Sequence, residues 1–479
     1  MSTNRYLQTV QLDIFCNTDF LGALKEDNCI GAAKFTMCMK QLKARNSTGS
    51  VVLDAGDAFM GTPLSNFYYG KPVVEMMNEN EYDAMAIGNH EFDWGTDRLL
   101  KTLNTANFNV LSANLFYNHG EKVEWAKPYV IVKKKGVSIG IIGLSTVETP
   151  YTTASSNVKE YVFRQPIKVV KELIPKVKED GADIIILLGH LPVYFNGGKP
   201  AGELIDLVDS TEDIDVAIGG HSFIPYATLR NDIPIVLTSP RGSMIGHIRI
   251  CFNRKANQII NKEVKLIDLN RRFNNLNPDQ KIQNMVQQYD KGLNKKFSKV
   301  IGRTDKDLFV KPDQQFELGS WISNTICKNT SAQIGFYNPY GIFGDIYSGD
   351  ITVGDIYRIC PFNSFLVCSK LTGRQILEIL SQSVTLEKGM LQISGLRVKL
   401  SSFTEKEYTI KDKDVRLLDG KPLKLDESYT VGTTEFLASG GDKFKTFTEV
   451  SWKKTQIKLR AALTDRIKKE GTIKSKLFY

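Results

Sequence analysis

The stretch Ala86-Ile87-Gly88-Asn89-His90-Glu91-Phe92-Asp93 decides the fold of this 479-residue chain, because a short apolar run ends there in a sharp polar turn. Three other stretches follow the same pattern. Residues 51–57 (VVLDAGD) end in Gly-Asp, and residues 184–190 (IIILLGH) and 216–221 (VAIGGH) each end in Gly-His. Short apolar runs that stop at glycine are typical of buried strands followed by a turn. The sequence therefore predicts four strands whose ends carry polar side chains.

The four strand ends supply the side chains that a divalent metal ion needs. Asp57, Asn89, His190 and His221 offer hard or borderline oxygen and nitrogen ligands. An ion held in this way lowers the pKa of bound water and keeps one position open for a substrate. We therefore predict a metal site built from these residues.

His90 and Asp93 form a second functional pair. His90 directly follows Asn89, so its imidazole can donate to a leaving-group oxygen or to a phosphoryl oxygen. Asp93 can orient that ring and raise its basicity. We predict that both are catalytic, whereas His119 and His247 are interpreted as structural histidines.

These motifs resemble those of the 5'-nucleotidase family of metallophosphoesterases. Residues 56–63 (GDAFMGTP) are similar to the family's GD-x-F-x-G-T-P segment, and residues 88–93 (GNHEFD) are similar to its most specific signature. In the C-terminal half, residues 360–362 (CPF) and 436–444 (FLASGGDKF) look like its PF and FLA-x-GGD-x-F motifs. The resemblance implies an α/β fold, with a four-layer metallophosphoesterase sandwich followed by a second α/β domain, the 5'-nucleotidase C-terminal domain.

The resemblance also implies a nucleotide site in the C-terminal domain. Phe362 and Phe444 would sandwich a nucleobase, because aromatic faces stack on any base with a gain of about 1–3 kcal/mol each. Asn338 would be a contact to the base. The family reads its nucleotide with an Asn-Gly-Gly-x-Ile-Arg loop, whereas residues 338–343 read NPYGIF here. Phe343 therefore replaces an arginine that would grip an anionic group.

Two further departures fall on one of the family's two metal positions. The family's Asp-x-His-Gly motif becomes residues 19–22 (DFLG), so Leu21 replaces a histidine ligand. Its Gly-His-x-His or Gly-His-x-Gln motif ends here in Phe223. Only Asp19 and the bridging Asp57 remain at this position. We therefore expect one tightly bound divalent ion, such as zinc or manganese, rather than two.

Length and periodicity predict two domains. A chain of 479 residues with 42% hydrophobic content exceeds the usual size of one domain. Apolar runs alternate with helical patterns up to about residue 267, and the polar stretch 270–278 leads into a helix near 279–295. We predict a metallophosphoesterase domain at 1–269, a linker and connecting helix at 270–298, and the C-terminal domain at 299–479. Further helices are expected near 167–180, 373–383 and 456–469.

Composition narrows the location and the partners of the chain. Seven cysteines without a C-x-x-C motif indicate neither a disulfide framework nor a zinc knuckle. Residues 1–6 lead straight into the first strand without the apolar core of a signal peptide, and no run approaches transmembrane length. The basic tail 452–479 is interpreted as a solvated amphipathic helix. The sequence therefore predicts an intracellular, cytoplasmic protein with no nucleic-acid partner and no transmembrane segment.

Three functions remain open at this stage. Hydrolysis of nucleotide phosphate esters, weakened by the loss of one metal position, is favoured by the retained ligands and by the pair of His90 and Asp93. A catalytically inactive homologue that serves as a structural or assembly component, with protein partners, is favoured by the three replaced residues Leu21, Phe223 and Phe343. A sensor that binds a nucleotide or nucleoside without turnover is favoured by the aromatic pair and the retained asparagine of the C-terminal domain.

Overall fold

The computed structural model describes residues 9–26, 29–273, 275–385, 388–404 and 407–473. The chain forms two compact units. The first comprises Met1–Pro150 and Ser156–Asp290, and the second comprises Lys291–Tyr479 with the short segment Tyr151–Ser155. The domain boundaries expected at residues 269 and 299 stay predictions. The expectations for residues 1–6 and 474–479 lie outside the described residues.

The first unit contains a sheet with the strand order β16-β15-β1-β2-β3-β4. Its strands are β1 (Thr9–Asn17), β2 (Ser50–Asp54), β3 (Ala84–Ala86), β4 (Asn109–Leu111), β15 (Met244–Asn253) and β16 (Gln258–Asp268). Strands β1 to β4 are parallel, whereas β15 pairs antiparallel with both β1 and β16. Strands β2 and β3 are buried at every position, as expected where both faces of a parallel sheet are covered.

A second sheet of the same unit has the order β13-β14-β12-β9-β7-β6. Its strands are β6 (Tyr129–Lys134), β7 (Val137–Ser145), β9 (Ile184–His190), β12 (Val216–Ile218), β13 (Tyr226–Arg230) and β14 (Ile233–Leu237). Strands β7, β9, β12 and β14 are parallel. Both sheets therefore carry a block of parallel strands whose carboxyl ends lie at one edge.

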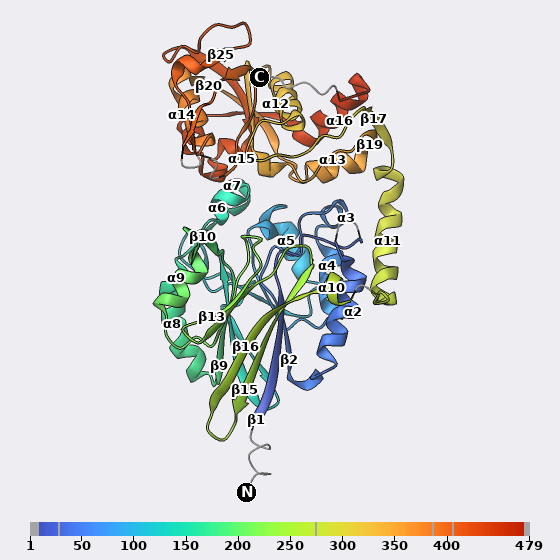
Figure 1. The fold of residues 1–479 in the computed structure, drawn as a ribbon, viewed down its shortest axis with the longest axis vertical. Helices are drawn as coiled ribbons and strands as arrows, with labels where there is room; N and C mark the ends of the chain where they lie inside the picture. The colour runs from blue at the N-terminus through green and yellow to red at the C-terminus, as the bar shows by residue number, and fades with distance from the viewer. Residues whose placement is uncertain (1–8, 27–28, 274, 386–387, 405–406, 474–479) are drawn as a thin grey trace. The chain divides into compact units, whose positions relative to one another are not determined.

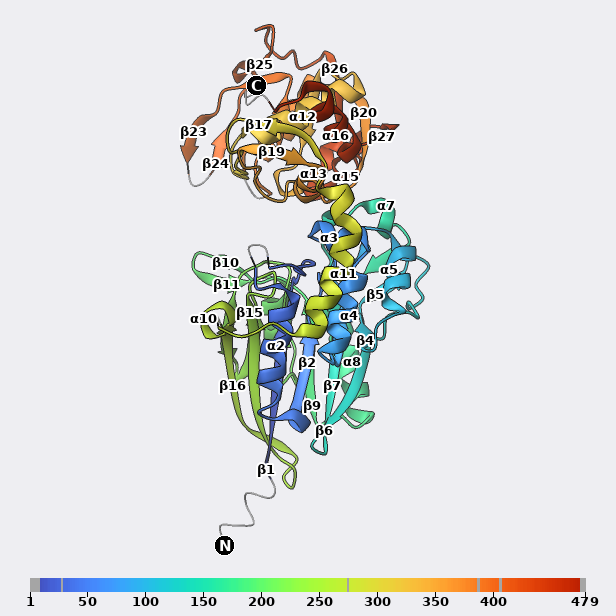
Figure 2. The same cartoon turned by 90° about the vertical axis from the view of Figure 1, so that its right-hand side faces the viewer.

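The two sheets and their helices form the four layers expected from the sequence. Inward-facing residues of both sheets, such as Leu53 of β2 and Ile186 of β9, share one core cluster. A second cluster joins the other face of the second sheet to α8 (Pro166–Glu179) and α9 (Glu203–Ser210). Helices α2 (Gly31–Lys43), α4 (Lys71–Glu79) and α5 (Thr96–Leu103) lie on the opposite side of the unit (Figures 1 and 2). The predicted α/β sandwich is confirmed.

The second unit is built on a mixed sheet with the order β21-β18-β26-β20-β27. Its strands are β18 (Ile334–Tyr337), β20 (Phe365–Thr372), β21 (Gln392–Ser394), β26 (Ser428–Thr434) and β27 (Lys453–Lys458). One core cluster contains residues of α12 (Glu317–Thr330), α13 (Val353–Ile359) and α16 (Leu459–Glu470). The other contains residues of α14 (Gly373–Ser383) and α15 (Glu435–Ala438). The second α/β domain is confirmed as well.

The expected helices are present, with one shifted start. The helix predicted near 167–180 is α8, and the one predicted at 373–383 is α14. The connecting helix is α11 (Gln280–Phe297), preceded in the expected linker by the short α10 (Leu269–Arg272). The helix predicted from 456 begins only at Leu459, because residues 453–458 pair with β20 as strand β27.

The remaining elements are short. They are α3 (Pro63–Phe67), α6 (Thr149–Thr152), α7 (Ser155–Val158), β5 (Leu115–Tyr117), β8 (Tyr161–Phe163), β10 (Tyr194–Asn196), β11 (Lys199–Ala201), β17 (Val300–Thr304), β19 (Gly349–Thr352), β22 (Leu396–Val398), β23 (Ser401–Thr404), β24 (Glu407–Thr409) and β25 (Val415–Leu417). Among the described residues, no helix is both long enough and apolar enough to cross a membrane.

Candidate metal centre

The candidate ligands lie at the carboxyl ends of parallel strands from both sheets. Asp19, Asp57 and Asn89 follow β1, β2 and β3 of the first sheet. His190 is the last residue of β9, and His221 follows β12, in the second sheet. The edge formed by these strand ends is where open α/β sheets bind their ligands. Residues that are far apart in the sequence can therefore meet there.

Three of the candidate ligands are close enough to hold one ion. Asp57, His190 and His221 each offer a ligand atom, and these atoms lie within 4.8 Å of one another. The Nε2 atom of His190 lies 3.0 Å from Asp57 Oδ2 and 4.0 Å from Asp19 Oδ1. The rings of His190 and His221 meet edge to face, with centroids 5.2 Å apart.

Several buried polar atoms of this cluster have no hydrogen-bond partner among the described residues. They are Asp19 Oδ1, His190 Nε2 and both side-chain polar atoms of Asn89. These three side chains are at most 1% exposed. Leaving such an atom unpaired costs roughly 1–3 kcal/mol. A divalent ion would remove that cost at Asp19 Oδ1, His190 Nε2 and Asn89 Oδ1 together, so these three atoms fit a metal ion. The amide nitrogen of Asn89 is a hydrogen-bond donor and cannot be a ligand.

Neighbouring groups decide which nitrogen of each histidine is left for an ion. The Nδ1 atom of His190 lies 2.8 Å from the carbonyl oxygen of Ala55, so Nδ1 carries the proton and Nε2 is the ligand atom. The Nε2 atom of His221 lies 3.7 Å from Glu148 Oε2. A carboxylate at that place favours a proton on Nε2 and leaves Nδ1 as the ligand atom. Glu148 follows β7 and was missed by the sequence reasoning, since no motif marks it.

Glu91 is the second residue that the sequence reasoning missed. Its carboxylate is completely buried and accepts hydrogen bonds from the backbone N–H groups of Asp57, Ala58 and Gly88 at 2.8–2.9 Å. It therefore ties the loop after β2 to the loop after β3, and it holds Asp57 and Asn89 in place. Glu91 belongs to the quoted motif, but the motif alone does not show that its side chain turns toward the backbone.

The predicted catalytic pair is formed. The Nδ1 atom of His90 lies 2.8 Å from Asp93 Oδ2. The backbone N–H of His90 donates to Asp57 Oδ1 at 2.8 Å, and its Nε2 atom lies 4.0 Å from Asp57 Oδ2. Burial alone would lower the pKa of His90, but the charges of Asp93 and Asp57 raise it to about 9. His90 is therefore oriented by Asp93 beside the candidate metal ligands.

Three buried carboxylates, those of Asp19, Asp57 and Glu91, lie close together at the centre. Burial raises the pKa of Asp19 and of Glu91, and the nearby charge of Asp57 adds to both shifts. Burial would lower the pKa of His190, yet the charges of Asp57 and Asp19 raise it to about 10. Carboxylates packed this closely favour any positive charge among them. The electrostatics therefore agree with a cation site.

The loops at the centre hold several residues in the left-handed region. Asp19, Asp57 and His221 have φ values of 53°, 54° and 74°. This conformation costs a residue other than glycine roughly 1–2 kcal/mol. Leu21 and Phe223 share it, with φ values of 51° and 57°. Leu21 and Phe223, where the resemblance predicts a lost ligand, thus share the backbone conformation of Asp19, Asp57 and His221.

The residues predicted to bind a nucleobase lie in the second unit. Phe444 is only 2% exposed and packs against Phe447 in a core cluster. Phe362 is partly buried, and the ring of Phe343 packs edge to face against it at 5.5 Å between centroids. Asn338 follows β18 and is 7% exposed. The binding role of these residues stays a prediction.

Comparison with known proteins agrees with this architecture. The calcineurin-like phosphoesterase family model matches residues 27–225, and the model of the 5'-nucleotidase C-terminal domain matches residues 300–449. The 5'-nucleotidase of Vibrio parahaemolyticus is 27% identical over 441 residues, which cover 83% of this chain and 77% of that protein. The endonuclease YhcR of Bacillus subtilis is 26% identical over 440 residues, which cover 88% of this chain but 35% of that protein. The chain therefore spans about a third of the length of YhcR.

Solved structures share the fold along the whole chain. The 5'-nucleotidase precursor from Thermus thermophilus has a TM-score of 0.80 at 24% sequence identity, and the match covers 98% of both chains. The two family models, the curated relatives and the shared fold agree with one another. The chain is therefore a member of the 5'-nucleotidase family, with a calcineurin-like phosphoesterase domain followed by a 5'-nucleotidase C-terminal domain.

Proposed function

We propose that this chain hydrolyses phosphate esters of nucleotides with one divalent ion held by Asp57, Asn89, His190 and His221. The observation that carries the proposal is the meeting of unpaired, buried polar atoms from separate strand ends at one place. Relatives named 5'-nucleotidase support the substrate class. When bound, a divalent ion supplies positive charge for the phosphoryl oxygens and activates water.

The protein's own residues donate the proton and hold the metal ligands in place. His90 holds a proton at Nε2 for the leaving-group oxygen, because its Nδ1 atom is engaged by Asp93 at 2.8 Å. Glu148 keeps the ring of His221 in one tautomer, and Glu91 fixes the loops that carry Asp57 and Asn89. These residues hold the reacting groups in one geometry before a substrate arrives, which reduces the entropic part of the barrier.

A single ion implies slow hydrolysis. Leu21 is buried and offers no ligand atom, and Phe223, which is 45% exposed, offers none either. The loss of one electrostatic stabiliser costs about 10²–10³ in rate. We therefore propose weakened activity compared with a relative that holds two ions.

The metal content and the turnover number test this proposal together. Elemental analysis of the dialysed protein should return one divalent ion per chain, and Asp57→Asn should return almost none. Asp206→Asn, which changes an exposed acid on α9 of the same unit, is the matched control and should keep the ion. Two ions per chain, or turnover of a nucleoside monophosphate in the ordinary range of about 1–10³ per second, would refute weakened one-ion hydrolysis.

An inactive structural or assembly component is the second candidate function. The packing of Phe343 on Phe362 and the burial of Phe444 favour it, because both reduce the aromatic surface left for a base. A protein without any turnover that still holds its metal ion would support this candidate. A protein with turnover that disappears in Asp57→Asn would exclude it.

We also propose that the protein works inside the cell. All seven cysteines are free thiols in the structure, and Cys16, Cys38, Cys327 and Cys360 among them are buried. Reducing compartments preserve such thiols, whereas secreted proteins of this size commonly pair them. Fractionation of the source cells followed by detection of the chain tests this, and recovery from the culture medium would contradict it.

A further inference from the structure

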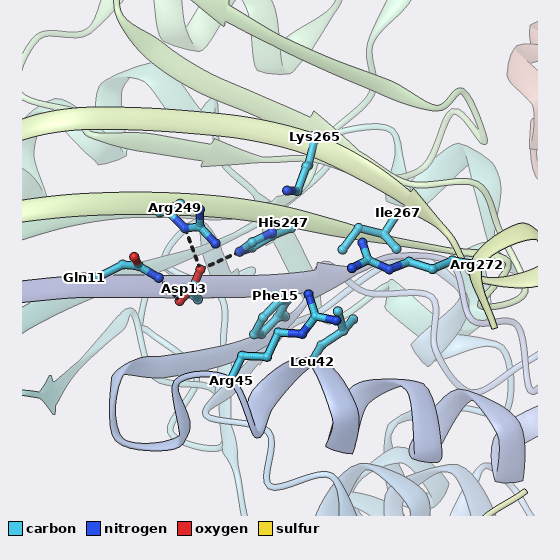
Figure 3. Close-up of a pocket in the computed structure, with 10 residues that line it drawn as sticks. All are labelled: Gln11, Asp13, Phe15, Leu42, Arg45, His247, Arg249, Lys265, Ile267 and Arg272. Carbon is cyan, nitrogen blue, oxygen red and sulfur yellow. Dashed lines mark hydrogen bonds and ion pairs between the residues drawn. The ribbon is translucent and has the colours of Figure 1, made fainter. Parts of the chain in front are cut away.

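A pocket on the outer face of the first sheet, away from the candidate metal centre, lies beneath the end of α2 (Figure 3). Successive side chains of β1 point to opposite faces of the sheet. Leu12 and Ile14 lie in the core between the sheets, whereas Asp13 and Phe15 face outward and line the pocket. None of the residues that line the pocket is a candidate metal ligand, and the six residues from Asp13 to Asp19 span at most about 20 Å. The pocket therefore belongs to a different site.

Strand register explains which side chains meet there. Asp13 of β1 pairs with Arg249 of β15, Phe15 pairs with His247, and His247 pairs in turn with Lys265 of β16. These partners lie on one face, since residues directly opposite each other share a side of the sheet.

Positive charge dominates the lining. Arg45, Arg249, Lys265 and Arg272 all line the pocket. Arg249 lies 3.2 Å from Asp13 and 3.8 Å from Glu263. The other three form no ion pair with any residue that the structure describes. Three cations thus face one small space without a carboxylate partner.

The one carboxylate of the pocket is already fully used. Asp13 Oδ1 accepts from His247 Nε2 at 2.6 Å and from Arg249 Nε at 3.2 Å, and its Oδ2 accepts from Gln11 and Asn46 at 2.7 Å. Burial would raise the pKa of Asp13, but these hydrogen bonds, led by the one from His247, hold it well below its usual value. Asp13 therefore stays ionised, and its single negative charge is opposed by Arg249, so the positive charges of Arg45, Lys265 and Arg272 remain in excess.

The size of the pocket restricts its occupant. The cavity has a volume of about 60 Å³. A single water needs about 10–15 Å³ on this measure, so there is room for roughly four to six atoms of that size. Figure 3 shows the guanidinium ends of Arg45 and Arg272 extending toward each other beside Phe15. Two like charges that converge repel each other, and an anion between them turns that repulsion into attraction.

We propose that this pocket binds a phosphate-sized oxyanion, either free or as the terminal group of a small phosphorylated molecule. Guanidinium groups suit this ligand because their planar donors bond two oxygens of a phosphoryl group at once. His247 forms the buried end of the pocket, stacked on Phe15 at 4.8 Å between ring centroids, and Asp13 holds its orientation.

Phosphate binding by the metal-loaded protein tests the proposal. Equilibrium dialysis against labelled inorganic phosphate, at fixed ionic strength, would compare the wild type with Arg45→Gln/Arg272→Gln. The wild type should bind one more phosphate per chain than the variant. If both proteins bind two, the wild type should bind the weaker phosphate at least about tenfold more tightly than the variant does. The variant lacks two charge-assisted contacts to this phosphate. Phosphate held at the metal centre should be unchanged between them. Equal binding by both proteins would overturn the proposal.

Two further variants keep the test independent of folding and of total charge. Lys168→Gln/Lys171→Gln removes the same charge from exposed positions on α8 and should keep the extra phosphate. Arg272→Glu places a carboxylate opposite Arg45, so it should abolish the extra phosphate and raise the melting temperature in phosphate-free buffer. Unchanged phosphate binding in Arg272→Glu would contradict the proposal.

Methylphosphonate distinguishes the two sources of the oxyanion. Its carbon–phosphorus bond resists hydrolysis at the metal centre, and it leaves only three oxygens for the pocket. If it competes with phosphate, the pocket accepts a phosphoryl group carried by a larger molecule. If only phosphate binds, the ligand is the free ion.

Discussion

The candidate metal centre of the first unit and the predicted nucleotide site of the second differ in how many of their side chains are already engaged by other protein groups. At the metal centre, buried polar atoms of Asp19, Asn89 and His190 converge without hydrogen-bond partners among the described residues. In the second unit, Phe444 is packed into the core and Phe343 covers part of Phe362. A binding site keeps bonding capacity for its ligand, and the first unit does so more clearly than the second.

The largest effect is expected from removing Asp57. Asp57→Ala should abolish metal binding and reduce hydrolysis by about 10³–10⁴-fold, since a metal ion supplies several kcal/mol of transition-state stabilisation. Phe444→Ala provides the contrast in the other unit. It should leave the metal content unchanged but reduce the free energy of unfolding by about 3–5 kcal/mol. Elemental analysis and thermal unfolding of both variants check this. A loss of metal from Phe444→Ala would contradict the claim that the metal ion is held by the first unit alone.

His90→Ala should reduce kcat by about 10³-fold, near the middle of the range for a lost general acid. The metal content should stay at one ion per chain, because His90 is not among the proposed ligands. Asp93→Asn should cost less, since it disturbs only the orientation of the ring. Rate measurements combined with elemental analysis decide the point, and a His90→Ala protein of unchanged rate would remove His90 from the mechanism.

The next variants place histidines where the resemblance predicts that metal ligands were lost. Leu21→His/Phe223→His should raise the metal content from one ion to two and increase hydrolysis by about 10²-fold, more than either single change. The backbone favours the substitution, because both positions have positive φ values, where histidine is more common than leucine or phenylalanine. A double variant that still holds one ion would show that more than these two ligands was lost.

A smaller effect is expected at Glu148. Glu148→Ala should weaken metal binding by about 10–100-fold, as is typical when the partner of a metal-binding histidine is removed. Glu148→Gln should retain more affinity, because its amide oxygen can still face His221 Nε2, which lies 3.7 Å from Glu148 Oε2. Competition with a chelator measures both constants. Wild-type affinity in Glu148→Ala would mean that Glu148 does not position His221.

The smallest expected effect belongs to the second unit. Millimolar adenosine or AMP should leave the melting temperature almost unchanged, since a ligand stabilises the fold only as far as it binds the native state. The resemblance implies that Phe343 stands in place of an arginine and Pro339 in place of a glycine, so we expect the loop to offer little to a nucleotide. A clear thermal shift that disappears in Phe362→Ala would instead make the nucleotide sensor the leading function.

The sequence alone determined the residue types of the metal centre and their order on the strands. Apolar runs that end in glycine and a polar residue predict the strand ends, and the strand ends carry the ligands. Local chemistry also determined α14, whose bounds match the prediction. Thr372 and Gln375 form a capping box at its start, with hydrogen bonds of 3.0 and 3.2 Å. These features depend on neighbours in the sequence, so they can be read from it.

Only the tertiary structure decided the contacts between distant segments. Glu91 accepts hydrogen bonds from the loop after β2 as well as from its own loop, and Glu148 lies beside His221 in the loop after β12. No spacing in the sequence indicates the partners in the other loops. The start of α16 shifted because residues 453–458 pair with β20, a contact that local periodicity does not report. The cationic pocket likewise joins β1, β15 and β16 to the ends of α2 and α10. Long-range strand pairing sets these neighbours, and hydrophobic periodicity records only which face of each element is buried.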